Sequence, residues 1–443
     1  MSALVAGFLR IAVIILEFPA LNETFILDHI TGLLRRGHDV RIFATAPKGE
    51  PKLHEEIQRY HLLERTVYRD SAKFTMPGNR FVRLLKAIPL IAEGLLANPR
   101  GTLNSLNVFR LGKAAVSLSA LYEAAPFLIQ SGRYDIVHSH FPENGELAVV
   151  LRDRGVLTGK IVTQFHSYHL PRSQDGTLRR LYPNLFERAD LLLTSGEHSK
   201  HFFDERGYGG ERMKIHRYSV DLQLFGPKAG PKNGDQIRLL SVGRLVEKKG
   251  FEFGIMGVAK ILRNFPNVRY EIAGDGPLKS NLERLIAELG VGNNIKLLGW
   301  QDRDEVLGLL RQTDIFLAPC VTSDGRTHGW AGDVETGPVV VLEAMASGIP
   351  VISTRHTGIP EFLHDGASGF LLEERDAEGI ADRLTYLLQH PESWGEMGKK
   401  GRKRVEEYHN LERQIDRLIE HYQSLIQEDS LGPQALQNRT QSA

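Results

Sequence analysis

Two glutamates eight positions apart, Glu335 and Glu343, flank the start of a helix that the sequence predicts near Pro338. After Glu335 the chain has, in order, a Gly-Pro pair, an apolar run that contains Glu343, Ser-Gly-Ile-Pro and a β-branched pair. This is typical of a loop, a short helix, a glycine stop and a buried strand. The first helical turn offers unpaired amides and the positive end of the helix dipole, which bind phosphate. Because carboxylates accept hydrogen bonds from hydroxyls, we predict a site for a sugar, a ribose and a diphosphate.

The residues expected to bind the diphosphate lie in this turn and in a second, cationic one. Arg244 and Lys249 flank a glycine-bounded turn after a strand predicted at residues 237 to 242. Arginine binds phosphate with a two-pronged fork and lysine acts as a point charge, although a lysine in a turn is often merely solvated. The helical turn contributes Gly337, Pro338, Val339, Val340 and Val341.

The elements that must position these residues alternate between strands and helices, which predicts an α/β protein with parallel sheets covered on both faces. We expect a first Rossmann-like domain at residues 1–225, a Gly- and Pro-rich linker at 226–236 and a second domain at 237–408. A helix at 409–426 and a disordered tail at 427–443 follow. The first strand, 11–16, precedes a helix at 22–36 that Asn22 is expected to cap. No Gly-x-Gly-x-x-Gly follows that strand, which argues against a dinucleotide-dependent oxidoreductase.

Composition excludes several classes of protein. The 55 basic and 54 acidic residues nearly cancel, which argues against nucleic acid as a partner. A single cysteine, Cys320, cannot form an intrachain disulfide, and we interpret it as a packing residue. The apolar run 11–16 is too short to span a bilayer and lacks the cleavage site of a signal peptide. We therefore expect a cytoplasmic protein, with attachment to the inner face of the plasma membrane left open.

Two further segments stand out. A helical insertion at about 73–130 is apolar and basic, and from residue 73 to 113 it carries seven cations against Glu93 alone. It is either a surface for anionic lipid or for the phosphates of a lipid-linked acceptor, or simply a solvated helical insertion. The polar, glycine-rich loop 323–333 directly precedes Glu335, so we expect it to shape or cover the sugar pocket.

The phrase around Glu335 and Glu343 closely resembles the Glu-seven-residues-Glu signature of retaining GT-B glycosyltransferases. Val-Gly-Arg-Leu followed by Lys-Gly, around Arg244 and Lys249, resembles the phosphate-binding pair of the same family. The phrase from Asp221 to Phe225 resembles the last element of its first domain. The chain is therefore similar to the glycogen-synthase-like family, glycosyl transferases group 1, and to its bacterial exopolysaccharide enzymes of colanic-acid type.

The resemblance implies a GT-B fold, in which two Rossmann-like domains face each other across a cleft and a C-terminal helix crosses back to the first. It implies that a sugar moves, with retention, from a nucleotide diphosphate to a glycan or a lipid-linked acceptor. Arg244 and Lys249 would stabilise the leaving group, Glu335 would hold the sugar and Glu343 the ribose. His166, at the end of a strand predicted at 160–165, would line the reacting face. Without this resemblance, a lone histidine is more often a satisfied polar group.

The resemblance further implies no metal and no cofactor beyond the donor. Two alternatives remain at this point. A GT-B-shaped sugar-nucleotide epimerase would convert the donor without any acceptor. A two-domain sugar-binding protein would catalyse nothing.

Overall fold

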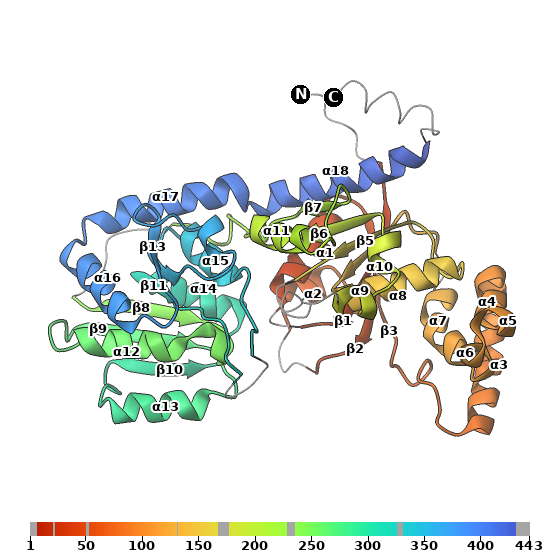
Figure 1. Ribbon diagram of the computed structural model, residues 1–443, viewed down its shortest axis with the longest axis horizontal. Coiled ribbons are helices and arrows are strands. Elements are labelled where there is room, and N and C mark those ends of the chain that lie inside the picture. Colours follow the sequence, from red (N-terminus) through yellow and green to blue (C-terminus); the bar gives the residue numbers. More distant parts are fainter. Residues whose placement is uncertain are drawn as a thin grey trace.

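The computed structural model describes residues 7–20, 23–49, 53–130, 132–166, 177–227, 235–325 and 331–430. Two parallel sheets form the cores of two domains that face each other, which confirms the predicted α/β architecture (Figure 1). The linker predicted at 226–236 lies largely outside the described residues, as do Asn22 and the middle of the loop 323–333.

The first sheet has seven parallel strands in the order β3-β2-β1-β4-β5-β6-β7. Along β1 the side chains alternate, so that Ala12 and Ile14 enter one core while Ile11, Val13 and Ile15 enter the other. This sheet is therefore buried on both faces, as continuous apolar strands require. Its strands are β1 (Arg10–Glu17), β2 (Asp39–Ala46), β3 (Thr66–Tyr68), β4 (Ile136–His140), β5 (Lys160–Gln164), β6 (Leu191–Thr194) and β7 (Met213–Ile215).

The second sheet has six parallel strands in the order β10-β9-β8-β11-β12-β13. Both sheets reverse their order beside their first strand, which leaves a crevice at the carboxyl ends of the strands. The strands are β8 (Ile237–Val242), β9 (Val268–Ala273), β10 (Ile295–Gly299), β11 (Ile315–Ala318), β12 (Val351–Thr354) and β13 (Gly369–Leu372).

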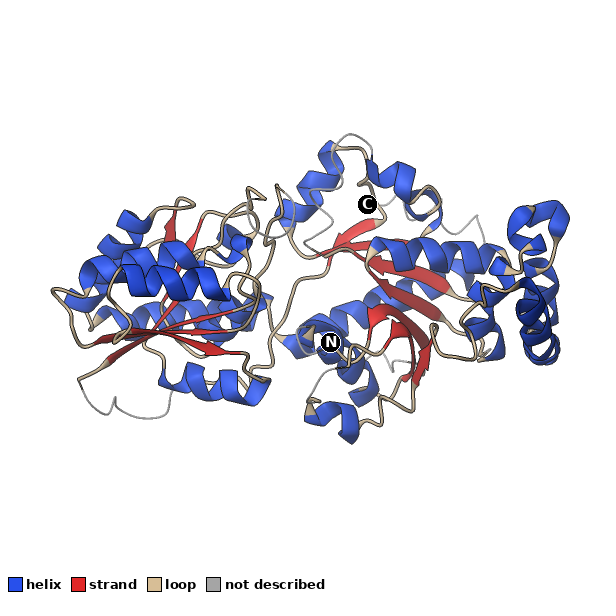
Figure 2. Ribbon diagram, turned by 90° about the horizontal axis from the view of Figure 1, so that it is seen from below, coloured by secondary structure: helices blue, strands red, loops and turns tan. Residues whose placement is uncertain are grey.

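Helices cover both faces of each sheet (Figure 2). In the first domain they are α1 (Thr24–Arg35), α2 (Glu55–Arg59), α3 (Arg80–Ala97), α4 (Pro99–Ser105), α5 (Val108–Leu111), α6 (Lys113–Val116), α7 (Ser119–Ile129), α8 (Pro142–Asp153), α9 (Thr177–Leu181), α10 (Leu185–Arg188) and α11 (Glu197–Glu205). In the second they are η3 (Glu247–Lys249), α12 (Phe251–Ile261), α13 (Lys279–Glu288), α14 (Arg303–Gln312), α15 (Val339–Ala346), η4 (Ile359–Glu361), α16 (Ala377–Gln389) and α17 (Ser393–Tyr408). None of the described helices has both the length and the hydrophobicity that crossing a bilayer requires.

The last helix, α18 (Leu411–Ser430), returns to the first domain and packs against α1 (Figure 1). Its apolar residues Leu411, Ile415, Leu418, Ile419, Tyr422 and Leu425 complete a core of the first sheet. A side chain at Gly32 of α1 would lie 2.7 Å from Ile415, so glycine permits this close approach. The helix continues to Ser430, which corrects our prediction that a disordered tail begins at residue 427. Residues 431–443 lie outside the described residues.

Candidate active site

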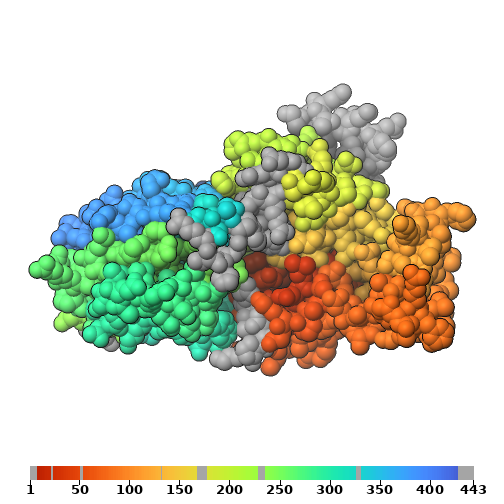
Figure 3. Space-filling view, turned by 60° about the horizontal axis from the view of Figure 1, so that its bottom comes forward, coloured from red at the N-terminus to blue at the C-terminus, as the bar shows by residue number. Residues whose placement is uncertain are grey.

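A cavity of about 380 Å³ lies between the two domains, where the carboxyl ends of their strands meet. Figure 3 shows the two domains side by side, the second in green to blue and the first in red to yellow. The second domain contributes the turn after β8, the ends of β9 and β10, and the start of α15. The first domain contributes the start of α1 and the segments after β5 and β7. The cavity wall includes every predicted site residue except Val341, namely His166, Arg244, Lys249, Glu335, Gly337, Pro338, Val339, Val340 and Glu343.

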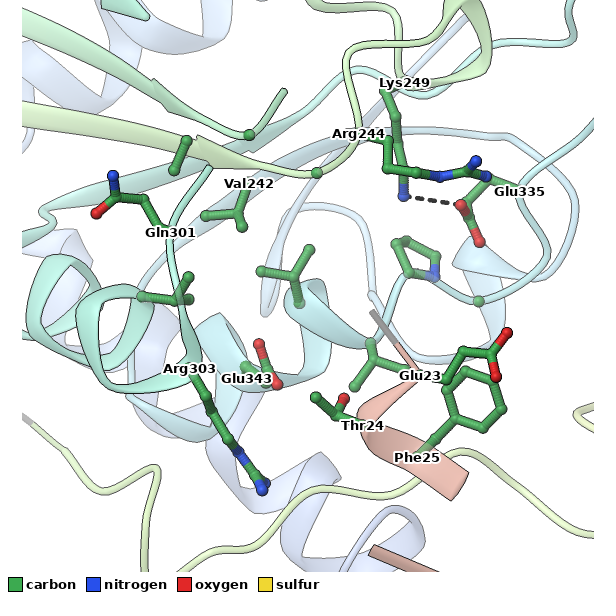
Figure 4. A pocket seen from close by; sticks show the side chains of 18 of the residues that line it. Glu23, Thr24, Phe25, Val242, Arg244, Lys249, Gln301, Arg303, Glu335 and Glu343 are labelled. Atoms are coloured by element: carbon green, nitrogen blue, oxygen red, sulfur yellow. Dashed lines mark ion pairs between the residues drawn. The ribbon is translucent and has the colours of Figure 1, made fainter. Parts of the chain in front are cut away.

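Lys249 and Glu335 form an ion pair in this cavity, with Nζ 2.7 Å from Oε2 (Figure 4). Their side chains are only 14% and 13% exposed, so each charge depends on the other. Burial alone would raise the pKa of Glu335, but the ammonium groups of Lys249 and Lys248 lower it to about 2. Burial would likewise lower the pKa of Lys249, and Glu335 raises it. Both groups are therefore charged at neutral pH.

Arg244 lies beside this pair, and its guanidinium extends towards Glu335 (Figure 4). It is exposed to the cavity and forms no ion pair with a described residue. Lys248 also lines the cavity, but its Nζ donates to Asp333 and to the carbonyl of Val334, at 3.2 Å each. Of the two adjacent lysines, Lys249 therefore pairs with Glu335 itself, while Lys248 holds the segment before Glu335.

The backbone of Glu335 is fixed from behind by the buried ring of His356. The amide of Glu335 donates to His356 Nε2 at 3.0 Å, and Nδ1 of the same ring is bonded to Glu374 at 2.5 Å. Because Nε2 accepts, Nδ1 carries the proton and donates to the carboxylate. Burial lowers the pKa of His356, which favours this neutral ring. Thr357 donates to the carbonyl of Glu335 and fixes its other side.

The amino end of α15 opens onto the cavity, with Pro338 as its cap residue. The amide of Val341 donates to the carbonyl of Pro338 at 2.9 Å, so it is not available to a phosphate as we expected. Val339 and Val340 line the cavity. A side chain at Gly337 would lie 2.6 Å from the ring of Tyr218, so this glycine lets the two domains pack closely.

Glu343 lies one turn further along α15, on the cavity wall near Arg303 of α14 (Figure 4). Burial raises the pKa of Glu343 to about 7, and Arg303 opposes that rise only in part. Arg303 is committed elsewhere, because its guanidinium forms a two-pronged pair with Asp28 of α1 at 3.1 and 3.2 Å. Both partners are nearly buried, so this pair ties the second domain to the first at the edge of the cavity.

Sequence reasoning missed several residues of the cavity wall, among them the polar residues Glu23, His54, Tyr218 and Arg303. Burial raises the pKa of Glu23 to about 7. Glu23 lies in the loop after β1, at the ligand edge of the sheet, so its position was a usable signal. Nothing local distinguishes Arg303, because its partner Asp28 is 275 positions away.

His166 is one end of a buried chain of side-chain hydrogen bonds in the first domain. Tyr218 is bonded to His166 at 3.1 Å, His166 to His140 at 3.1 Å and His140 to His29 at 3.0 Å. Tyr422 of α18 then joins His29 at 3.2 Å to His138 at 2.6 Å. We call these six residues the histidine chain.

The protons of the histidine chain are coupled. Burial lowers the pKa of His29, His138 and His140 well below the usual value, so these rings are neutral. A neutral ring donates from one nitrogen and accepts at the other. If His29 donates to His140, then His140 must donate to His166. If instead His166 donates to His140, then His140 must donate to His29. The proton position on His166 therefore depends on groups deep in the domain.

One group of described residues has the spacing of a metal site. One ring nitrogen from each of His29, His138 and His140 lies within 4.8 Å of the others. Hydrogen bonds already engage these rings, except at Nε2 of His138, which has no partner. None of the three lines the cavity. Cys320 is buried, and burial raises the pKa of its thiol to about 12, in agreement with a packing role.

Two family models match the chain, one for each domain. "Glycosyl transferases group 1" matches residues 225–404, and "Glycosyl transferase 4-like domain" matches residues 23–218. Together they cover both sides of the cavity.

Curated relatives match almost the whole chain. A putative colanic acid biosynthesis glycosyltransferase, WcaL of Escherichia coli, is 31% identical over 413 residues, which cover 92% of this chain and 97% of the relative. The amylovoran biosynthesis glycosyltransferase AmsK of Erwinia amylovora is 32% identical over 382 residues, which cover 84% and 89%.

Solved structures share the fold. Anabaena HepE in complex with UDP and glucose superposes with a TM-score of 0.68 at 16% identity, covering 94% of this chain and all of that one. Sucrose-phosphate synthase from Thermosynechococcus elongatus gives a TM-score of 0.67 at 19% identity, covering 95% and 100%. At these identities the likeness concerns the fold, which is GT-B.

Proposed function

Because the chain belongs to the group 1 glycosyl transferases, among the exopolysaccharide biosynthesis enzymes, we propose that it moves a sugar from a nucleotide diphosphate to an acceptor hydroxyl with retention of configuration. The proposed acceptor is a glycan or a lipid-linked saccharide. The transfer needs no metal ion in the cavity.

The observation that carries this proposal is the meeting of the Lys249–Glu335 ion pair with the amino end of α15 in one cavity. A departing nucleoside diphosphate gains negative charge as its bond to the sugar breaks. Lys249, Arg244 and the helix end are directed at that charge before it develops, which is the efficient form of electrostatic catalysis. Two cations and a helix dipole supply the role that a divalent ion has in other transferases.

In the proposed step, the bond between the anomeric carbon and the phosphate oxygen breaks while the acceptor oxygen bonds to the same carbon from the same face. The acceptor proton moves to the departing phosphate oxygen, so the products are the glycoside and the nucleoside diphosphate. A double displacement would need a free carboxylate as nucleophile. Glu335 is engaged with Lys249, so it is better suited to accept hydrogen bonds from the sugar hydroxyls.

Glu343 is proposed to accept hydrogen bonds from the ribose, and His166 to line the face on which the acceptor attacks. HepE, whose title names UDP and glucose, supports a nucleotide sugar as the donor class. We propose that the reaction takes place in the cytoplasm, where nucleotide sugars are available, on an acceptor held at the inner face of the membrane.

The test is incubation of the purified protein with a panel of nucleotide sugars, with and without a lipid-linked saccharide, followed by assay of nucleoside diphosphate. Release that requires the acceptor, and a product with the donor's anomeric configuration, are expected. Lys249→Ala should abolish the release, whereas Lys296→Ala, an exposed lysine on β10, should not change it. An epimerised donor formed without any acceptor would favour an epimerase. Donor binding without turnover would favour a sugar-binding protein.

A further inference from the structure

The helices α3 to α6 form the end of the first domain that lies farthest from the second domain (Figures 1 and 2). Twenty large hydrophobic side chains of the described residues are exposed, and eleven of them lie between residues 80 and 117. The exposure is therefore concentrated on one part of the molecule rather than scattered. We call the eleven the apolar patch: Phe81, Val82, Leu84, Leu85, Ile88, Leu95, Leu96, Leu103, Val108, Phe109 and Val116.

Helix α3 is apolar on two faces. Ala87, Leu90 and Gly94 face inward, where the helix packs against α7 and α4. Phe81, Leu84, Leu85, Ile88 and Leu95 recur at helical spacing on a neighbouring face, and they are between 38% and 70% exposed. The inward face accounts for the folding of α3. The second face has no packing partner among the described residues.

The other patch residues project from α3 itself and from the short helices α4, α5 and α6. Phe109 of α5 is fully exposed, Leu96 at the end of α3 is 89% exposed and Val116 of α6 is 70% exposed. The side chains of Asn79, Asn98 and Asn107 accept hydrogen bonds from the first-turn amides of α3, α4 and α5. These caps define where α3, α4 and α5 begin, and α6 packs against α5 and α7.

Cations surround the patch. Arg80, Lys86, Arg100, Arg110 and Lys113 are exposed, and none of them forms an ion pair with a described residue. The single acid between residues 80 and 117, Glu93, is paired with Lys73 at 2.6 Å. The surface therefore combines exposed apolar tips with positive charge that is not neutralised by neighbouring acids.

We propose that this end of the molecule docks on a bilayer that contains anionic lipids, with the apolar patch among the acyl chains and the five cations at the headgroup phosphates. Amphipathic surfaces with basic residues beside large apolar side chains bind membranes in this way. An apolar patch without these charges would fit a protein partner equally well. The charge complementarity therefore selects the anionic bilayer. This inference deepens the proposed function, since a docked enzyme meets a lipid-linked acceptor, but its test involves no acceptor.

The test is co-sedimentation of the full chain with vesicles of phosphatidylcholine alone or of phosphatidylcholine and phosphatidylglycerol. We expect binding to the anionic vesicles that weakens as salt rises. Two triple variants should each reduce the affinity for anionic vesicles by at least about tenfold, because a few apolar side chains or charges readily contribute that much. One is Phe81→Ser/Leu85→Ser/Ile88→Ser, and the other is Lys86→Glu/Arg110→Glu/Lys113→Glu. The matched controls are Leu289→Ser/Tyr386→Ser and Lys296→Glu/Lys399→Glu/Lys403→Glu, which alter exposed residues of the second domain.

Absence of wild-type binding at low salt, or equal binding by the patch variants, would overturn the inference. So would a wild-type dimer in solution that the Phe81→Ser/Leu85→Ser/Ile88→Ser variant abolishes, because a second copy would then cover the patch. Circular dichroism confirms that each variant is folded. Sugar transfer to a soluble, lipid-free saccharide, measured as release of nucleoside diphosphate, tests the proposed function separately. Its rate should be unchanged in the patch variants.

Discussion

The two walls of the cavity differ in the charge of their polar groups. The second domain presents full charges, with Arg244 exposed and Lys249 paired to Glu335. The first domain presents His166 and Tyr218, backed by neutral rings in the histidine chain, together with Glu23, whose pKa burial raises to about 7 and so towards the neutral form. The charged wall is suited to a group whose charge grows during the reaction. The neutral wall is suited to a hydroxyl nucleophile, which it can orient without competing for the phosphate.

The two walls also depend on their surroundings to different extents. Lys249 and Glu335 come from neighbouring loops of one sheet, and His356 and Glu374 fix them within the same domain. The histidine chain draws on α1, β4, the segment after β5 and the returning helix α18. We therefore expect substitutions in the charged wall to act on chemistry directly, and those in the neutral wall to act through the position of a proton.

The largest effect is expected from Lys249→Ala and Glu335→Ala. Each should lower the transfer rate by about 100-fold or more, the loss typical of removing one preorganised group that binds developing charge. Rates are measured by nucleoside diphosphate release at saturating acceptor. Lys296→Ala and Glu283→Ala, both exposed in the second domain, serve as controls. If Lys249→Ala or Glu335→Ala transferred sugar at the wild-type rate, the charged wall would not act on chemistry and the distinction between the two walls would be lost.

A smaller effect is expected where the walls are joined, at the pair of Asp28 with Arg303. Asp28→Asn leaves a nearly buried guanidinium without its carboxylate, and breaking such a pair costs about 3 kcal/mol. We expect a lower unfolding midpoint and a donor KM that rises more than kcat falls. Urea unfolding and steady-state kinetics measure both. A change confined to kcat would mean that Arg303 acts on chemistry rather than on the closure of the domains.

Tyr422→Phe should have a milder effect and would sharpen the role of the neutral wall. It removes one hydroxyl from the histidine chain and keeps the ring, which packs from α18 into the core of the first sheet. We expect kcat to fall by a factor of about 3 to 10, as the loss of one buried hydrogen bond implies. The 15N shifts of the His166 ring should move as well, which packing alone would not cause. Tyr386→Phe, on an exposed tyrosine, is the control.

The smallest effect concerns pH. The pKa of Glu343 is about 7 in the folded protein because of burial, above its ordinary value of 4.5, so the folded state binds the extra proton. Stability should therefore fall as pH rises from about 5 to 8, and Glu343→Gln should flatten that fall. The pKa of Glu335 is lowered to about 2, so its contribution is complete above its unfolded pKa and is lost only as pH falls towards 2. Glu335→Gln should shift the unfolding midpoint without changing its slope over the same range, and thermal unfolding at several pH values measures both.

The sequence predicted the charged wall better than the neutral one, for a physical reason. Arg244, Lys249, Glu335 and the start of α15 each belong to a short phrase in which turn, helix cap and strand follow one another. The choice between Lys248 and Lys249 depended on resemblance, and geometry separates them. The amide of Val341 was wrongly expected to be available, because the turn at Pro338 already engages it.

The neutral wall is assembled from distant segments, so no local sequence pattern predicts which of its residues contact one another. His29 and Tyr422 are 393 positions apart. The ion pair that joins the two walls is likewise made by distant residues, because Asp28 and Arg303 are 275 positions apart. Strand and helix periodicity gave both sheets and the returning helix, since these depend on apolar spacing alone. It did not give the end of α18, whose last residues continue a helix without a clear stop signal.

The central claim is that Lys249 and its neighbours bind the diphosphate of the donor. The most direct measurement is calorimetric titration of a nucleoside diphosphate and of the matching monophosphate into the wild type and into Lys249→Met/Glu335→Gln, which removes both charges of the buried pair together. We predict that the wild type prefers the diphosphate by about tenfold or more, as one additional charge-assisted contact implies, and that the variant loses this preference. An unchanged preference in a folded variant would contradict the account.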